Sequence, residues 1–321
     1  MINRTFRRAT DLSSWRRISL HLWRHPRDPS VYGNLEINMR RACEYLRLVN
    51  ERTGGAKVTV THLVAKAIAR ALAAHPEANA IIARRSIYYR PTVDVFCQVA
   101  TEGGKDLSGV KICSVDRKSI TEVADELAQR IDRLQRRADA GSERTKRTVL
   151  AVPHRLLGPV LRVIEFLSYD LRIDLSRFGI EFDQFGAAMV SNVAGFGLAH
   201  GLAPLVPATR TPIVLLVGKI QDRPVVEEGR LAIAPCLTIG CTFDHRLIDG
   251  YQAGAMAQIV TETMADPFRH IGLPTRSSSA GDRIVLDQPG TTSTGDGGST
   301  YTDRTGQSTE EEPLPGSTAD D

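Results

Sequence analysis

The stretch from Pro212 to Gly250 reads PIVLLVGKI, then QDRPVVEEGR, then LAIAPCLTIGCTF, then DHRLIDG. Its two apolar runs, Pro212–Ile220 and Leu231–Phe243, are rich in the aliphatic and β-branched residues that favour strands. The residues between the runs include Asp-Arg-Pro and Glu-Glu-Gly, which are typical of turns. A parallel pair needs a longer crossover connection, so the stretch predicts two antiparallel strands.

Further helices and strands surround this pair without alternating strictly. Val60–His75 has apolar residues at helical spacing and stops at Pro76, and a second helix begins at Ser119, which forms a capping box with Glu122. The other strand-like runs are Val93–Thr101, Val110–Val115 and Ala188–Asn192. This order favours an α+β fold over a doubly wound parallel sheet. There is no Gly-x-Gly-x-x-Gly or Walker loop to indicate a nucleotide site of those kinds.

The composition indicates a packed globular protein. The 321 residues are 42% hydrophobic. No apolar run reaches the length of about 18 residues that a membrane-spanning helix needs. The five cysteines lack the C-x-x-C spacing of a metal or redox site. Residues 1–24 carry six arginines but no apolar segment of a secretory signal. Such an opening can imitate a mitochondrial transit peptide, but we expect a cytoplasmic protein.

The charge is divided unevenly along the chain. Residues 276–321 hold nine Asp and Glu against three Arg and so have a net charge of −6. Because the whole chain has a net charge of +4, residues 1–275 carry +10. The last 46 residues are dominated by Ser, Thr, Gly, Asp and Pro, which predicts a disordered acidic tail. The basic body suits an anionic substrate, nucleic acid or anionic lipid. We expect no nucleic acid, because the arginines and lysines are not interleaved with aromatics.

The segment that could perform chemistry is the turn after the second strand. Its histidine, His245, stands at the mouth of a strand, where the backbone can hold the ring ready to act as a general base. Asp249, at the entry to the next helix, can hold the loop through an ion pair or cap that helix. A histidine followed by Asp and Gly also fits a purely structural role.

Four ordered segments resemble one family. Thr242–Gly250 resembles the signature of the catalytic domain of 2-oxoacid dehydrogenase acyltransferases (E2 components), whose fold and motif chloramphenicol acetyltransferases share. Segments that resemble other parts of the same domain are Val58–Ala67 with His75–Ala80, Met189–Gly197, and Pro204–Pro207 with Pro212–Gly218. The resemblance covers about Trp15–Asp266 and implies a chloramphenicol acetyltransferase-like two-layer fold over residues 1–275, with a mixed sheet and flanking helices.

The resemblance also implies an activity, that of a coenzyme A-dependent acyltransferase. His245 would deprotonate the thiol of coenzyme A or dihydrolipoamide, Ser191 would stabilise the tetrahedral oxyanion, and Asp249 would be architectural. Acyl-CoA would be a substrate, with no covalently bound cofactor. The family's active site lies between subunits of a homotrimer, so Ser191 and His245 would come from different chains. Ser191 could instead be a turn residue, and Asn192 is typical of a turn.

The sequence departs from the family in two main places. The resemblance begins almost at the N-terminus, without a lipoyl or subunit-binding domain, so a lipoyl group would come from another protein in trans or the acceptor would differ. The stretch 138–186 is longer than is usual and contains an apolar, helix-like run over 152–169. This run could pack on the core or a neighbouring subunit, line an acyl pocket, or touch a membrane, which we do not favour. Tyr251 and Asn38 are smaller departures that leave the substrate open.

Three other functions fit less well. Condensation-type acyltransferases carry a second histidine directly before the catalytic one, where this chain has Asp244. A non-catalytic trimeric scaffold or partner protein is disfavoured by the presence of both His245 and Ser191. Nucleic-acid binding would rest on the basic charge alone.

Overall fold

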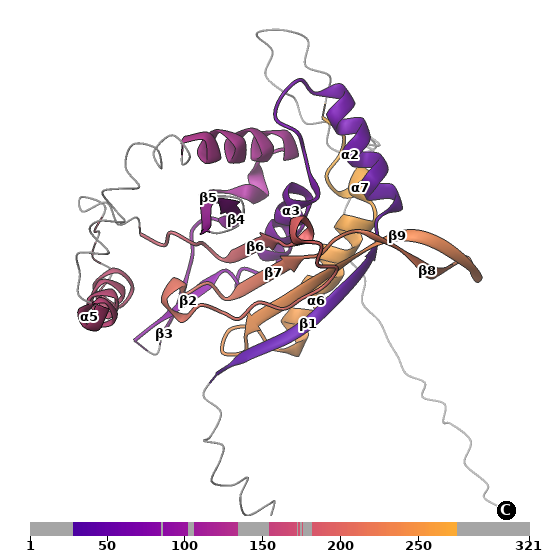
Figure 1. Ribbon diagram of the computed structural model, residues 1–321. Helices are drawn as coiled ribbons and strands as arrows, with labels where there is room; N and C mark the ends of the chain where they lie inside the picture. The colour runs from indigo at the N-terminus through magenta and orange to yellow at the C-terminus, as the bar shows by residue number, and fades with distance from the viewer. Residues whose placement is uncertain are drawn as a thin grey trace, which may run out of the picture. The chain divides into compact units, whose positions relative to one another are not determined.

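The computed structural model describes residues 28–84, 86–101, 106–133, 154–171, 173, 175 and 182–274 (Figure 1). The predicted tail at 276–321 lies outside these ranges, as does much of 138–186. The strands are β1 (Ser30–Asn38), β2 (Ala80–Ala83), β3 (Ser86–Tyr89), β4 (Val95–Thr101), β5 (Asp106–Ile112), β6 (Ala188–Asn192), β7 (Ile213–Val217), β8 (Gln221–Glu227) and β9 (Arg230–Asp244). The helices are α2 (Arg40–Arg52), α3 (Val60–Ala74), a helix over residues 120–133, α5 (His154–Glu165), α6 (Gly250–Ala265) and α7 (Pro267–His270).

A seven-stranded mixed sheet organises the described part of the chain. Its order is β1-β9-β7-β6-β4-β5, with β8 paired to β9. Only the β4–β6 and β6–β7 pairs are parallel. The predicted antiparallel pair is confirmed as β7 and β9, with Ile213 opposite Phe243. The predicted α+β class, with a mixed sheet and flanking helices, is also confirmed.

The sequence prediction missed β8, because it read those residues as a turn. The strand alternates between exposed and half-buried positions and pairs only with the first part of β9. Together they form a ribbon that projects beyond the rest of the sheet (Figure 1). Val226, Leu231 and Ile233 on this ribbon are each more than 70% exposed. A strand outside the core gives little hydrophobic signal in the sequence, although every residue of β8 is paired with β9.

Helices α3 and α6 cover one face of the sheet. Nearly every residue of α3 from His62 to Leu72 is buried, and the helix ends before Pro76 as predicted. Inward residues of α6 include Met256, Val260 and Met264, which pack into the same core as the strands. The predicted capping box at Ser119 is confirmed, since its hydroxyl accepts from the Glu122 N–H and the Glu122 carboxylate accepts from the Ser119 N–H. None of the helices in the described ranges has the length and apolar character needed to cross a bilayer.

The opposite face is covered by the segment 194–212. This segment crosses β7 and β9 so closely that a Cβ added to Gly240 would collide with the carbonyl oxygen of Gly201. Thr242 donates a 2.6 Å hydrogen bond to the Ala203 carbonyl on the same side. The two faces can therefore be told apart by alternation along β9: even-numbered residues near its end meet the loop, and odd-numbered ones meet the helices.

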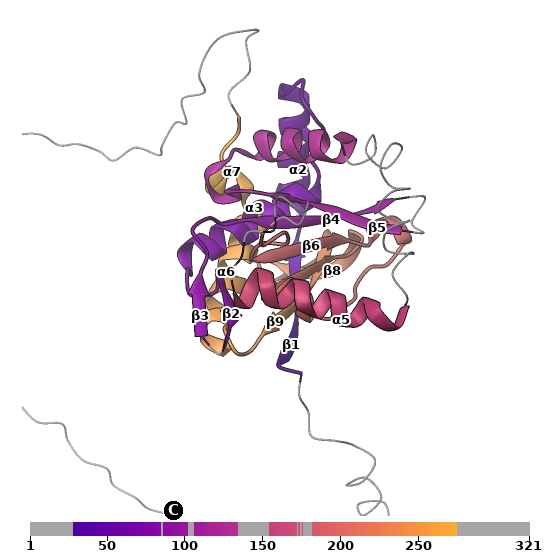
Figure 2. The same cartoon turned by 90° about the vertical axis from the view of Figure 1, so that its left-hand side faces the viewer.

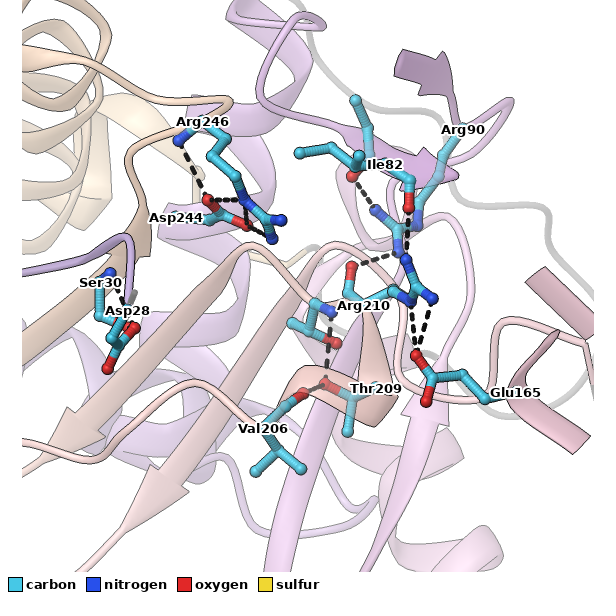
Figure 3. A network of polar contacts seen from close by, with 12 residues as sticks. Asp28, Ser30, Ile82, Arg90, Glu165, Val206, Thr209, Arg210, Asp244 and Arg246 are labelled. Atoms are coloured by element: carbon cyan, nitrogen blue, oxygen red, sulfur yellow. Dashed lines mark hydrogen bonds and ion pairs between the residues drawn. The ribbon is translucent and has the colours of Figure 1, made fainter. Parts of the chain in front are cut away.

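The predicted helix within 152–169 is confirmed as α5, which continues into a π-helical turn over Phe166–Asp170 (Figure 2). Arg210 ties this element to the body of the protein (Figure 3). Its guanidinium binds the Glu165 carboxylate at 2.7 and 2.9 Å and the Asp170 carboxylate at 3.3 Å, and it donates to the Ile82 carbonyl at 2.8 Å. Val160 and Phe166 remain more than 40% exposed, so only one side of the element is packed.

Candidate active site

His245 is the first residue of the turn after β9, and its backbone is still held by the sheet. Its N–H donates to the Pro29 carbonyl at 3.0 Å, which extends the β1–β9 ladder one step beyond the Ser30–Asp244 pair. The side chain is exposed and forms no hydrogen bond with the described residues. The backbone hydrogen bond to Pro29 continues the alternation of β9 by one residue past Asp244, which puts His245 on the same face as Phe243 and Cys241, toward the helices. A ring so placed is anchored by its backbone and open to a partner.

Asp249 is a helix cap, which decides between the two roles that the sequence left open. Its carboxylate accepts from the N–H of Tyr251 at 2.8 Å and of Gln252 at 3.4 Å, and its own N–H donates to the Gln252 side chain at 3.1 Å. These bonds start α6, and no ion pair of Asp249 is present among the described residues. The cap fixes the far end of the turn that carries His245.

An ion pair that the sequence reasoning did not use flanks His245. The Asp244 carboxylate binds the Arg246 guanidinium at 2.6 and 2.9 Å and also accepts from the Arg246 N–H at 3.0 Å (Figure 3). The Asp244 side chain is only 9% exposed, and its hydrogen bonds raise the pKa of Arg246. The sequence does contain a signal for this ion pair, because an acidic and a basic residue stand on either side of the histidine. The pair lies on the loop face, so it braces the turn from the side opposite His245.

Ser191 lies in β6 on the loop face of the sheet. Its neighbours Met189 and Val214 belong to the small apolar cluster on that face, and its register partner is Leu216. The hydroxyl is half-buried and makes no hydrogen bond with the described residues. Asn192 forms a turn as predicted: its side chain accepts from the Ala194 N–H and donates to Thr61, both at 2.9 Å. Ser191 is thus held by rigid neighbours while its own hydroxyl is free.

The structure does not bring Ser191 and His245 together within one chain. Ser191 pairs with Leu216, which pairs with Gly240, five residues before His245. Two strand spacings and five steps along a strand place the two Cα atoms on the order of 19 Å apart. They also leave the sheet on opposite faces. No single acyl group could contact both residues of the same chain.

Two cavities with charged or polar lining residues open near these residues. One, of about 560 Å³, adjoins the turn, and its lining includes Asp28, Glu165, Arg210, Asp244 and Arg246. Both arginines already have a carboxylate partner, because Arg210 binds Glu165 and Arg246 binds Asp244. The other, of about 370 Å³, reaches Asn192 and includes Lys57, Gln98 and His62. Burial lowers the pKa of His62 to about 4, so this ring is neutral at pH 7. No cluster able to hold a metal ion occurs in the described ranges.

Sequence comparisons with known proteins agree on one family. A sequence model of the 2-oxoacid dehydrogenases acyltransferase (catalytic domain) family matches residues 13–149 and 181–271, and the match breaks across the segment that contains α5. The dihydrolipoyllysine-residue succinyltransferase component of the mitochondrial 2-oxoglutarate dehydrogenase complex of Bos taurus is 32% identical over 128 residues, which are 37% of this chain and 28% of that protein. The dihydrolipoyllysine-residue acetyltransferase component of the acetoin cleaving system of Bacillus subtilis is 24% identical over 217 residues, 68% of this chain and 44% of that protein.

The chain therefore spans less than half the length of these two relatives. Among solved structures, the dihydrolipoamide acetyltransferase of Azotobacter vinelandii superposes with a TM-score of 0.55 at 19% identity, covering 76% of this chain and 84% of that one. In that protein the roles of one serine, one histidine and one asparagine in the catalytic mechanism were investigated. At this identity the likeness shows a shared fold.

Proposed function

The chain belongs to the 2-oxoacid dehydrogenase acyltransferase (catalytic domain) family, and from that premise we propose that it transfers an acyl group between coenzyme A and a thiol. The acceptor in this proposal is a dihydrolipoyl group carried by another protein, or another acceptor in its place. The named relatives act on dihydrolipoyllysine residues, which supports this choice. Coenzyme A is then a substrate, and no covalently bound cofactor takes part.

His245 is the general base of the proposed reaction. It takes the proton from the acceptor thiol, and the thiolate attacks the carbonyl carbon of the acyl-CoA thioester. The tetrahedral intermediate places a negative charge on the former carbonyl oxygen, to which the Ser191 hydroxyl donates a hydrogen bond. Collapse breaks the bond to the sulfur of coenzyme A, and the protonated His245 returns its proton to that sulfur. Asp249 and the Asp244–Arg246 pair position the turn.

The observation that carries the proposal is the distance between Ser191 and His245 in one chain. Both residues are presented for chemistry, one with an exposed ring and the other with an unbonded hydroxyl, yet they lie on opposite faces of the sheet on the order of 19 Å apart. A site that needs both must combine two copies of the chain. We therefore propose a homotrimer in which each active site takes His245 from one subunit and Ser191 from its neighbour.

The spacing of the Azotobacter residues supports the assignment. Its histidine and asparagine are four positions apart, like His245 and Asp249, and its serine precedes the histidine by 52 positions, against 54 for Ser191 and His245 here. This chain has a carboxylate where that protein has an amide. Both can accept hydrogen bonds at a helix N-terminus, so the capping role of Asp249 is compatible with either.

Subunit mixing tests the shared site. His245→Ala and Ser191→Ala chains are each expected to release almost no thiol from acyl-CoA in the presence of dihydrolipoamide. Trimers refolded from an equal mixture contain interfaces at which an intact His245 meets an intact Ser191, so a fraction of the activity returns. Mixed trimers as inactive as either parent, or a fully active monomer by sedimentation, would contradict the shared site. If the wild type releases no thiol from any acyl-CoA, a scaffold role replaces the enzyme.

A further inference from the structure

We propose that an apolar cavity between the sheet and α6 holds the hydrocarbon chain of the acyl group, so that the substrate is a medium-chain acyl thioester. This proposal rests on the acyl transfer proposed above and names its substrate class. The cavity has a volume of about 270 Å³ and is distinct from the charged cavity beside Arg246. Its position, lining and free space each support an acyl chain as the occupant.

The cavity lies on the face of the sheet to which His245 points. Phe243 and Cys241 line it from β9, and Ile248 lines it from the far side of the catalytic turn. His245 is two residues beyond Phe243 with the same alternation. Along the strand the cavity runs from about 7 Å to about 13 Å from His245, where Gly33 lies opposite Cys241. A two-carbon acyl group at His245 reaches none of this space, whereas a longer chain does.

The mouth of the cavity lies between β1 and α6. Asn34 and Gly254 are exposed there, while Ile68, Ile213 and Val260 are at most 5% exposed and form the floor. A Cβ atom added to Gly33 or to Gly254 would have no neighbouring atom within 4 Å, so both glycines border open space. A dry apolar cavity of about 150 Å³ takes up benzene, and this cavity, with almost twice that volume, has room for an apolar group larger than benzene.

The lining selects against charged acyl groups. The Asn34 side chain leaves β1 on the face opposite Gly33, as Tyr32 does, and the other side chains around the cavity are apolar or a thiol. Burial raises the pKa of the Cys241 thiol to about 12, so it stays neutral. A buried carboxylate without a cation or donor is strongly disfavoured. A succinyl group would bring such a carboxylate, so the cavity favours an apolar chain over the succinyl group that the bovine relative's name gives.

Chain-length preference provides the test. With dihydrolipoamide as acceptor, we expect kcat/KM for octanoyl-CoA to exceed those for acetyl-CoA and succinyl-CoA by at least tenfold, because each buried methylene favours binding. Gly33→Leu fills the cavity from β1 and is expected to lower octanoyl transfer at least tenfold while acetyl transfer changes less than threefold. Tyr32→Leu is the matched control, since the neighbouring side chain leaves the same strand on the opposite face and is 47% exposed. It should preserve the preference.

A second measurement separates the cavity from the reaction. Octan-1-ol has no thioester, so its binding to the wild type, followed by NMR, reports on the cavity alone and should be lost in Gly33→Leu and kept in Tyr32→Leu. Robust acetyl transfer without an octanoyl preference, or equal loss of both activities in Gly33→Leu, would overturn the cavity proposal and leave the proposed function standing. If no acyl-CoA is used at all, the proposed function and the acyl role of the cavity fail together, even where octan-1-ol binds.

Discussion

We expect the folded protein to lose stability in mild acid, because His62 is buried at the start of α3. Its ring is 6% exposed, and Nδ1 accepts from the Thr59 N–H at 2.9 Å and lies 3.0 Å from the Thr59 hydroxyl. A proton on Nδ1 would remove the acceptor and place a charge in the interior. Burial therefore lowers the pKa of His62 in the folded protein from 6.5 to about 4. The fold favours the neutral ring.

The sign and size of the effect follow from proton uptake. Between pH 6.5 and about 4 the unfolded chain binds this proton and the folded chain does not, so stability falls as the pH falls through this window. Above pH 6.5 the contribution is complete, and below about pH 4 it is lost. A pKa difference of about 2.5 units corresponds to about 3 kcal/mol of unfolding free energy.

His62→Gln isolates this contribution. Glutamine at the third helical position can accept from the Thr59 N–H but does not titrate. Urea unfolding of both proteins at pH 7, 5.5 and 4, at one fixed protein concentration, should show the wild type losing about 3 kcal/mol more than the variant. Other titrating groups are common to both proteins and cancel. Parallel pH dependences would refute the reasoning, because His62 would then take up its proton equally in both states.

Three further outcomes are expected. His245→Ala should lower turnover by about two to four orders of magnitude with an unchanged far-UV spectrum, and near-full activity would exclude it as the base. Asp249→Ala should lower the unfolding free energy by about 1 kcal/mol while Asp249→Asn restores it, since asparagine also caps helices; equal loss in both would contradict the cap. Arg210→Ala should expose α5 to limited proteolysis and destabilise the fold by about 1 to 2 kcal/mol, with Arg210→Lys recovering only part, because lysine cannot bind Glu165 and Asp170 as a fork. Unchanged proteolysis would show that α5 does not depend on Arg210.

The local features were readable because their causes lie within a few consecutive residues. The apolar spacing and Pro76 predict the helix over Val60–Ala74, and the capping box at Ser119 lies within four residues. The β7 strand is a continuous apolar run, and β6 begins with three apolar residues before Ser191. By contrast, α2 buries only Ala42, Tyr45 and Val49 among charged residues, so its sequence looks like a solvated segment. Its burial depends on what packs against it.

By itself the sequence determined the turn around His245, the family and the α+β class, because each depends on contiguous motifs and their order. Only the tertiary structure decided that Asp249 caps rather than pairs, that Arg210 holds Glu165 from 45 residues away, and that Ser191 and His245 lie on opposite faces of the sheet. Strand register and face are set by hydrogen bonds between distant segments, and a shift of one residue would reverse every side chain. The cavity beside Gly33 likewise exists only where β1, β9 and α6 meet.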